Sequence, residues 1–358
     1  MLLTKPFDYI IIGGGIAGLL TAYEFREFNT LLIDRDGILK SGASAAAGAF
    51  LFIKVGYNTA YTKFINRSIL EALSFYESLG IETHKKGVLI LPRDKRDYEK
   101  FKKYEKEITI PFKKIDGGFY FKDSGVVDPQ EVREKIKVDF LQKKVKSIYK
   151  DGEYWIVEGL KTKNVILASG HETLVDCDYI NIRPVWGERI EGISDLEELE
   201  YHYHKNCSLA IIDGVTKIGA THKRNCQHCE VNMQEAEELL QKANEIKPIH
   251  SFIFTKTVGG FRAASSDYFP IVGNIIDVKK TLQLQPKIIK GEIPKKVEYI
   301  DGLYIINGMG GRGFSNAVSC AKRLKSYIIN KKPLGKLDTI RLFIKWARKL
   351  QRIDNVKG

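Results

Sequence analysis

The sequence predicts a mixed fold, α/β with α+β character, in which a Rossmann-like dinucleotide-binding domain is interrupted by an antiparallel-sheet domain. Three observations support this fold class. A strand, a glycine turn, a helix and a second strand follow one another over residues 7–34, which is the order of a βαβ unit. A second glycine turn follows a buried strand, at 308–314. Between these turns, residues 183–299 alternate short strands with loops around one helix, a pattern that favours antiparallel sheet.

The first βαβ unit is predicted from its apolar runs. Residues 7–12, FDYIII, form a short run rich in β-branched side chains, as expected of a buried strand. A helix is expected at about 16–28, after the glycine turn. Residues 30–34, TLLID, predict a second buried strand that ends in Asp34. This acidic residue therefore lies at the edge of the predicted sheet where the glycine turn also lies.

The later elements follow from the same rules. Apolar positions at helical spacing predict a helix over 60–79, and Asp-Pro-Gln-Glu predicts a helix start within 128–141. Residues 145–159 predict a hairpin that turns at Asp151-Gly152. The remaining predicted elements are strands at 88–92, 164–170 and 303–308, and helices at about 232–245 and 315–330.

The chain leaves its first domain and re-enters it, so both predicted domains are discontinuous. We assign residues 1–80, 130–182 and 300–358 to the dinucleotide-binding domain. Residues 81–129 and 183–299 are assigned to a substrate domain built on the antiparallel sheet. The boundaries rest on where strands of the first sheet are expected.

The composition is that of a chain with a sizeable core. Hydrophobic residues make up 44% of the 358 residues, which argues against wholesale disorder. We expect no membrane partner, because no uninterrupted run of about eighteen apolar residues occurs. The apolar N-terminal run is broken by glycines and is not expected to be a signal peptide. Five scattered cysteines predict a reducing, cytoplasmic setting without a disulfide framework.

The first glycine turn has the spacing of a dinucleotide-binding fingerprint. Gly13 allows the tight turn, Gly15 lets a pyrophosphate approach the backbone, and Gly18 lets the helix pack closely on the sheet. Asp34 is placed to accept hydrogen bonds from ribose hydroxyls. The alternative is a glycine-rich turn that binds no ligand. The strand before it and the helix after it favour the fingerprint.

The segment 37–50, GILKSGASAAAGAF, favours FAD over NAD. Its small residues lie directly after the acidic strand end. They would allow close backbone approach to a second, larger part of the ligand; the candidates are Gly42, Ala43, Ser44 and Gly48. The alternative is a flexible loop.

The second glycine turn repeats this logic near the other end of the sequence. Residues 303–308 form a buried run that leads into Gly-Met-Gly-Gly-Arg-Gly-Phe and then a helix. A helix N-terminus can stabilise negative charge on a reduced flavin ring. The candidate cofactor residues here are Gly308, Gly310, Gly311, Gly313 and Phe314.

These motifs, together with ILASG at 166–170 and GFRAASSDYFPIVGN at 260–274, resemble the FAD-dependent D-amino-acid-oxidase-like superfamily. Within it the sequence is most similar to the FAD domain of the bifunctional enzymes that make 5-methylaminomethyl-2-thiouridine in tRNA. The resemblance covers essentially the whole chain. It implies FAD as cofactor and adds Val145 and Gly170 to the expected cofactor site.

The resemblance also implies an activity. Arg262 would bind a substrate carboxylate, and Arg312 would act beside it in catalysis. The implied substrate is a tRNA wobble uridine with a carboxymethylaminomethyl group, which would be oxidised to release glyoxylate and leave aminomethyl-uridine. The alternative for Arg262 is a structural ion pair with Asp267 or another acid.

Two other functions are kept beside this one. A free amino-acid oxidase for glycine, sarcosine or a D-amino acid would share the cofactor, the arginine and the reaction. A non-catalytic protein that binds FAD and tRNA would never have its flavin reduced by an amine. The bifunctional enzymes carry a methyltransferase domain and this sequence starts at the FAD strand, so we expect a separate methyltransferase. We also expect a monomer.

The net charge of +13 is concentrated at the C-terminal end. Residues 330–358 hold nine Lys/Arg and two Asp, a net charge of +7. A helix is expected over 338–351, capped by Asp338 or Thr339. One face of it aligns the candidate tRNA-binding residues Arg341, Lys345, Arg348, Lys349 and Arg352. The alternatives are an ordinary solvated face and a membrane-surface helix.

A short segment at 221–232 contains a C-x-x-C with two nearby histidines. Such a set could hold zinc. No second C-x-x-C completes it, so we expect no metal and two incidental cysteines, Cys226 and Cys229.

Overall fold

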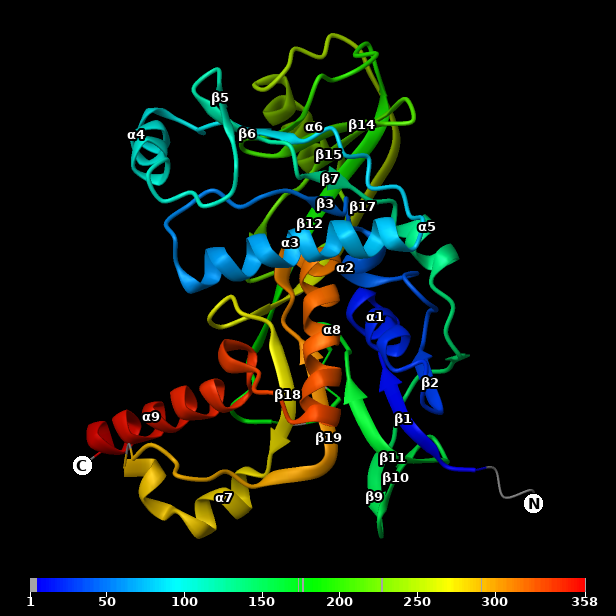
Figure 1. Ribbon diagram of the computed structural model, residues 1–358, viewed down its shortest axis with the longest axis vertical. Helices are drawn as coiled ribbons and strands as arrows, with labels where there is room; N and C mark the ends of the chain where they lie inside the picture. The colour runs from blue at the N-terminus through cyan, green and yellow to red at the C-terminus, as the bar shows by residue number, and fades with distance from the viewer. Residues whose placement is uncertain (1–4, 173, 176, 227, 291, 358) are drawn as a thin grey trace.

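The computed structural model describes residues 5–357 except 173, 176, 227 and 291, and gives only the backbone of 351–357. Figure 1 shows two sheet-containing parts, one below the other, with the long helix α3 (Ala60–Ser78) lying across the boundary between them. The mixed α/β architecture predicted from the sequence is confirmed.

The lower part is built on a sheet with the strand order β18-β19-β11-β1-β2-β8. Its parallel strands are joined by crossovers, so apolar residues of β1 meet neighbours on both sides and are buried. An antiparallel hairpin, β9 and β10, extends it beside β11 and turns at Gly152, as predicted. The strands are β1 (Phe7–Ile12), β2 (Thr30–Asp34), β8 (Phe140–Gln142), β9 (Ile148–Asp151), β10 (Tyr154–Val157), β11 (Leu160–Leu167), β18 (Ile271–Ile276) and β19 (Tyr299–Asn307).

Three helices cover one face of this sheet. The helices α1 (Ile16–Glu24) and α8 (Gly313–Asn330) follow the two glycine turns and pack against each other. Helix α3 packs on α8, and the buried Tyr76 hydroxyl donates to the Phe314 carbonyl at 2.8 Å. The apolar stripe of each helix therefore lies in one continuous core with the sheet. Both glycine turns are thereby held at the same edge of the sheet.

The upper part is built on a largely antiparallel sheet with the order β16-β12-β15-β14-β13-β4-β6-β5, and β17 pairs with β12 over their whole lengths. Helix α6 (Met233–Asn244) packs on this sheet. The strands are β4 (Val88–Ile90), β5 (Lys113–Ile115), β6 (Gly118–Phe121), β12 (Ile182–Ser194), β13 (His202–His204), β14 (Ser208–Ile212), β15 (Val215–Gly219), β16 (Lys223–Arg224) and β17 (Phe252–Ser265).

Short elements connect the two parts. A two-stranded sheet pairs β3 with β7. The remaining short elements are helices at the boundary, on the surface and near the C-terminus, and they are given next together with β3 and β7. Their bounds are α2 (Gly42–Ala45), β3 (Phe50–Leu51), α4 (Lys95–Tyr104), β7 (Gly125–Val126), α5 (Pro129–Lys135), α7 (Val278–Leu284), η1 (Pro286–Lys290), η2 (Gly310–Arg312), η3 (Gly335–Leu337) and α9 (Ile340–Lys357).

Two sequence-based boundaries are wrong. Residues 271–276 were assigned to the substrate domain, but β18 pairs antiparallel with β19 in the lower sheet. An isolated apolar strand carries no signal for which sheet it joins. The helix expected within 128–141 begins at its Asp128 cap, as expected, but ends at Lys135. Residues 140–142 form β8 instead, because they pair with the edge strand β2.

The C-terminal helix α9 is present and longer than expected. The Asp338 carboxylate accepts from the Ile340 amide at 3.0 Å, close to the predicted cap. Leu342, Phe343 and Ala347 are buried against the lower sheet. The opposite face carries exposed Lys345, Arg348 and Lys349. The side chain of Arg352 lies outside the described residues.

Arg341 does not belong to this exposed stripe, which corrects the sequence prediction. Its guanidinium pairs with the Asp267 carboxylate at 2.8 Å and donates to the carbonyls of Phe269 and Pro270 at 2.9 Å each. The first turn of α9 lies against the body of the protein, so this position is turned inward. Across the residues that the structure describes, no helix combines the length and the apolar character needed to span a bilayer.

Candidate functional site

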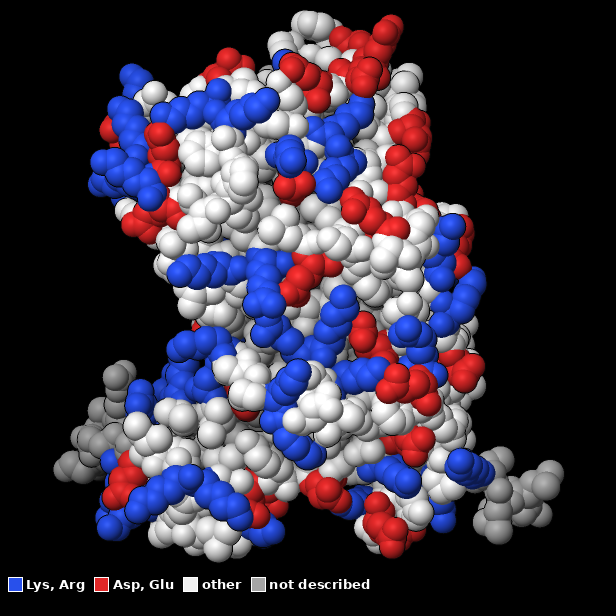
Figure 2. All heavy atoms as spheres, viewed as in Figure 1, with Lys and Arg blue, Asp and Glu red and all other residues white. Residues whose placement is uncertain are grey.

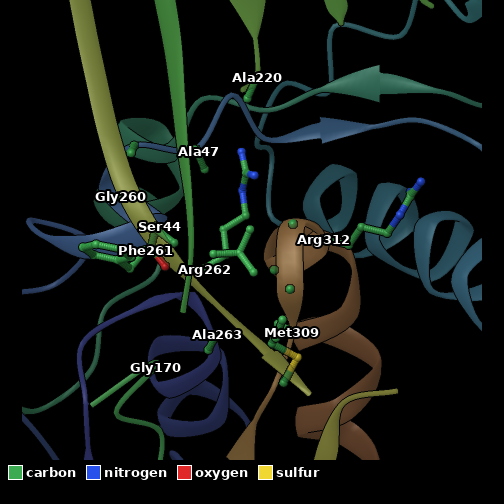
Figure 3. Close-up of a pocket in the computed structure, with 18 of the residues that line it drawn as sticks. Ser44, Ala47, Gly170, Ala220, Gly260, Phe261, Arg262, Ala263, Met309 and Arg312 are labelled. Atoms are coloured by element: carbon green, nitrogen blue, oxygen red, sulfur yellow. The ribbon is translucent and has the colours of Figure 1, made fainter. Parts of the chain in front are cut away.

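A cavity of about 1550 Å³ runs along the boundary between the two sheets. It is lined by the β1–α1 turn and Asp34. Arg262 and Arg312 line it as well (Figure 3). The predicted site residues gather here although they come from distant parts of the sequence. All the predicted cofactor residues except Gly18 line it, namely Gly13, Gly15, Asp34, Ala43, Ser44, Gly48, Val145, Gly170, Gly308, Gly310, Gly311, Gly313 and Phe314.

The glycines of the β1–α1 turn have two roles. Gly13 and Gly18 allow close approach of backbone atoms, and Gly15 faces the cavity. Gly13 has φ +116°, and a Cβ there would lie 2.4 Å from the Ala168 carbonyl oxygen. A Cβ on Gly18 would lie 1.8 Å from the Gly13 oxygen, so this buried glycine lets the helix sit on the turn. Gly15 instead faces the cavity, and the nearest atom to its Cβ position is the Ser44 hydroxyl, at 3.2 Å.

Asp34 is held rigidly at the cavity edge. One carboxylate oxygen accepts from the Gly14 amide at 2.7 Å, and the other accepts from the amides of Asp36 and Gly37 at 2.7 and 3.0 Å. These backbone donors fix the carboxylate in one orientation. Its remaining acceptor positions are available to a ligand that enters the cavity.

The small-residue segment lies beside this turn. The Ser44 hydroxyl accepts from the Ile16 amide at 3.0 Å, in the first turn of α1. A Cβ on Gly260 would lie 2.7 Å from the Gly42 oxygen, so α2 and β17 meet at backbone distance. Buried Arg189 donates to the Ala46 carbonyl at 2.9 Å and fixes the end of the segment. The segment is therefore part of the wall and not a free loop.

The second glycine turn faces the cavity from the lower sheet. The Asn307 side-chain amide donates to the Gly170 carbonyl at 2.8 Å, which joins the two cavity segments at the ends of β11 and β19. Gly308 and Gly310 have φ values of +72° and +58°, which favour glycine. The turn continues directly into α8, whose first residues include the buried Phe314.

Arg262 projects into the cavity from β17 (Figure 3). A Cβ on Gly187 of the paired strand β12 would overlap the guanidinium, at 2.1 Å, and a Cβ on Gly311 would lie 3.7 Å from the Arg262 Cδ. One terminal nitrogen, Nη1, donates to the Thr221 carbonyl at 3.0 Å and lies 3.4 Å from the His222 ring. Burial lowers the pKa of Arg262.

Part of the hydrogen-bonding capacity of the Arg262 guanidinium is not used by the described residues. Within the described part of the chain, Arg262 forms no ion pair, and neither its Nε nor its Nη2 makes a protein hydrogen bond. The alternative of a structural ion pair with Asp267 is wrong, because Asp267 pairs with Arg341. The Nε and Nη2 donors of a half-buried arginine can together hold a carboxylate in a bidentate manner.

Arg312 points away from Arg262 (Figure 3) and forms a second positive region. It donates to the Phe52 carbonyl at 3.1 Å, and burial lowers its pKa. Lys54, Arg93 and His204 also line this part of the cavity. Burial, with the nearby Arg312, lowers the pKa of Lys54. Sequence reasoning missed these residues, because no local motif surrounds any of them.

The C-x-x-C lies at the cavity wall. Cys226 and Cys229 form a disulfide, so the expectation of two incidental reduced cysteines is wrong. The two cysteines are three positions apart in the sequence, and their Cα atoms lie 5.8 Å apart. In the described residues, no three His, Cys, Asp or Glu side chains are grouped to hold a metal ion.

Comparison with known proteins identifies the family. The model of the FAD dependent oxidoreductase family matches residues 8–326. The chain belongs to this family. The expected FAD cofactor and superfamily are thus confirmed, and the protein is an FAD-dependent oxidoreductase.

The similar curated proteins share one description. The tRNA 5-methylaminomethyl-2-thiouridine biosynthesis bifunctional protein MnmC of Legionella pneumophila (strain Philadelphia 1) is 23% identical over 369 residues, which cover 90% of this chain and 54% of that protein. Its counterpart in Shewanella amazonensis is 25% identical, with 97% and 61% covered. The chain spans little more than half the length of these relatives. Glycine oxidase from Geobacillus kaustophilus has the same fold, with a TM-score of 0.74 at 17% identity over 94% of this chain and 99% of that one.

The cavity of this FAD-dependent oxidoreductase fits its cofactor. Its lining combines the fixed carboxylate of Asp34 with Gly15, whose backbone is open to the cavity. The N-termini of α1 and α8 both lie on the lining, through Gly15 and Gly313. A diphosphate favours such helix ends.

Two histidines, the buried His202 and the half-buried His204, make the stability of the protein depend on pH. Burial lowers the pKa of His202 and of His204 to about 4. Both are neutral in the folded protein, whereas an unfolded histidine takes up a proton near pH 6.5. The free energy of unfolding should therefore be highest above pH 6.5 and fall as the pH drops toward 4. We expect a loss of about 2 kcal/mol for each histidine between pH 7 and 5.

Urea unfolding at the two pH values, with FAD in excess, measures this loss. His204→Gln should remove about half of the difference between the two pH values. Equal stability at pH 7 and 5 in the unaltered protein would contradict the assignment.

Proposed function

We propose that this protein oxidises the carboxymethylaminomethyl group of a tRNA wobble uridine, releasing glyoxylate and leaving aminomethyl-uridine. The single observation that carries the chemistry is Arg262, a cavity arginine whose Nε and Nη2 donors are unused by the described protein residues. The tRNA substrate is supported by the MnmC relatives, which are named for tRNA thiouridine biosynthesis, and by the basic face of α9.

The cofactor residues of this proposal are those that line the cavity. Gly13, Gly15 and the start of α1 would hold the pyrophosphate, and Asp34 would accept from the ribose. Ala43, Ser44 and Gly48 would lie along the flavin part, together with Val145 and Gly170. The turn from Gly308 to Phe314 would place the N-terminus of α8 near the ring. Gly18 contributes by packing alone.

In the reaction, Arg262 would hold the substrate carboxylate through two parallel hydrogen bonds. This contact orients the adjacent CH₂, which lies between the carboxylate and the secondary amine of the substrate. Bound FAD supplies the acceptor for the hydride lost from that carbon. The substrate then carries an imine, and water adds to it to give glyoxylate and the free aminomethyl group. Orientation of this kind is a large part of the rate enhancement.

The second positive region has a supporting role. Arg312, Lys54 and Arg93 raise the positive potential of the cavity, which favours an anionic substrate and negative charge that develops during the reaction. Arg312 is fixed by the Phe52 carbonyl. We propose that it acts electrostatically, because its donor points away from Arg262.

A free amino-acid oxidase is the second candidate. It is favoured by the same donor fork of Arg262, which suits any α-amino carboxylate, and glycine oxidase shares the fold. In that case the basic face of α9 would be a solvated surface.

Anaerobic flavin absorbance separates these functions. Purified protein is mixed with tRNA that carries carboxymethylaminomethyl-uridine, and in parallel with glycine, sarcosine and D-alanine. Bleaching with the tRNA alone is the expected result. Bleaching with a free amino acid alone would make the protein an amino-acid oxidase. Flavin that no amine reduces would instead indicate a non-catalytic protein that binds FAD and tRNA.

A further inference from the structure

Tyrosines from three separate segments gather at one edge of the cavity. Tyr61 at the start of α3, Tyr104 at the end of α4 and Tyr268 in the loop after β17 all line it. Tyr57 packs edge-on against Tyr104, with ring centroids 4.9 Å apart. Tyr61 and Tyr268 lie with their centroids 6.2 Å apart. We call these four residues the tyrosine mouth.

The mouth leaves aromatic surface uncovered. Tyr268 is 60% exposed and Tyr57 is 48% exposed. Each of these two rings contacts one tyrosine of the mouth and leaves much of its remaining surface open to solvent. Such rings are a common platform for bases of single-stranded nucleic acid, because every base has a face that stacks.

Arg341 of α9 holds the loop that carries Tyr268 in place. Tyr268 has φ +69°, a conformation that is unfavourable for a bulky residue and is kept only where the surroundings enforce it. Arg341 enforces it through the Asp267 carboxylate and the carbonyls of Phe269 and Pro270. The strained backbone therefore points an exposed ring outward at a fixed place, beside the cavity.

Positive charge surrounds the rings. The Lys54 amine lies 5.9 Å from the centroid of Tyr61. Lys345 of α9 reaches the Ser266 hydroxyl at 3.4 Å, next to the Tyr268 loop. Figure 2 shows the surface hollowed between α4 and α9, with Lys and Arg side chains on both rims. Cations close to exposed aromatic rings suit the phosphates and bases of a single strand.

We infer that the tyrosine mouth binds the tRNA loop beside the oxidised uridine, with a neighbouring base stacked on Tyr268 and a neighbouring phosphate near Lys345. The inference rests on the proposed function and adds to it the place where the RNA is held. It accounts for the grouping of exposed rings, strained backbone and cations at one cavity edge. A free amino acid is too small to use any of them.

The test compares tRNA with the free nucleoside 5-carboxymethylaminomethyl-uridine, which has no neighbouring base. For Tyr268→Ala we expect the ratio of kcat/KM for tRNA to kcat/KM for nucleoside to fall about tenfold, the size of one lost stacking contact. Tyr268→Phe keeps the ring and should keep the ratio. Tyr149→Ala is the matched control, because Tyr149 is 55% exposed on β9 and lies outside the cavity lining.

Flavin content and melting temperature confirm that each variant is folded. Lys345→Gln should weaken tRNA binding and reduce the salt dependence of log Kd by about one charge. An unchanged ratio in Tyr268→Ala, or an equal loss with tRNA and nucleoside, would overturn the inference. If neither substrate reduces the unaltered enzyme, the proposed function fails instead. Titration of the unmodified tRNA then still tests the mouth, since Tyr268→Ala must weaken that binding while Tyr149→Ala must not.

Discussion

Arg262→Ala should slow reduction of the bound flavin by the carboxylate substrate by about 100- to 1000-fold, because two charge-assisted hydrogen bonds are lost. The fold should be kept, since the guanidinium makes no ion pair in the described part of the chain. FAD should stay bound. Anaerobic stopped-flow absorbance measures the reduction rate, and the flavin-to-protein absorbance ratio measures retention of the cofactor.

Two further variants sharpen this result. Arg262→Lys keeps the charge without the planar fork and should recover only part of the rate. Gly187→Ala should displace the guanidinium, because its Cβ would lie 2.1 Å from the Arg262 Nη2. It should therefore lower the rate although residue 187 carries no chemical group. If the substrate reduces the flavin of Arg262→Ala at the normal rate, the substrate carboxylate binds elsewhere.

Gly15→Ala should weaken FAD binding by about 30-fold, since overpacking at a close contact costs about 2 kcal/mol. Gly15 has ordinary backbone angles, φ −68° and ψ 176°, and its Cβ position meets only the Ser44 hydroxyl at 3.2 Å. The protein alone thus accommodates a methyl group after a shift of a few tenths of an ångström at the Ser44 hydroxyl, and the cofactor would meet that methyl group. Fluorescence titration of the apoprotein with FAD measures the change.

The control separates loss of cofactor from loss of fold. Gly56→Ala should change neither FAD affinity nor melting temperature, because the nearest atom to its Cβ lies at 3.8 Å and the residue is outside the cavity lining. Gly18→Ala should lower the melting temperature even without FAD, because its Cβ would overlap the Gly13 oxygen. Unaltered FAD affinity in Gly15→Ala would show that the pyrophosphate does not pass over this turn.

The features that sequence analysis predicted well are those with local causes. The turn at Gly13 and the hairpin at Gly152 need backbone angles that few other residues adopt, so the sequence marks them directly. A buried parallel strand is likewise recognisable as a short apolar run. Both glycine turns of the cavity were located in this way.

The features that sequence analysis missed depend on partners far away in the chain. Arg341 was expected on an exposed stripe, yet its acidic partner Asp267 lies 74 residues earlier. Helical spacing predicts which residues share one face of a helix. It does not predict which part of the protein lies against that face. Lys54 and His204 reach the cavity from different elements, and no spacing rule relates them. The strand β18 was misplaced for the same reason.

The short distance along the chain between Arg262 and Asp267 has a consequence for selectivity. Five residues of backbone span at most about 18 Å, and both ends are held, one by pairing with β12 and one by Arg341. This short segment of chain therefore fixes the distance between Arg262, the proposed carboxylate-binding residue, and α9. For the substrate proposed above, we expect that a modified base reaches both places only if its side chain has the matching length. Substrates with a longer or shorter arm should then be oxidised more slowly.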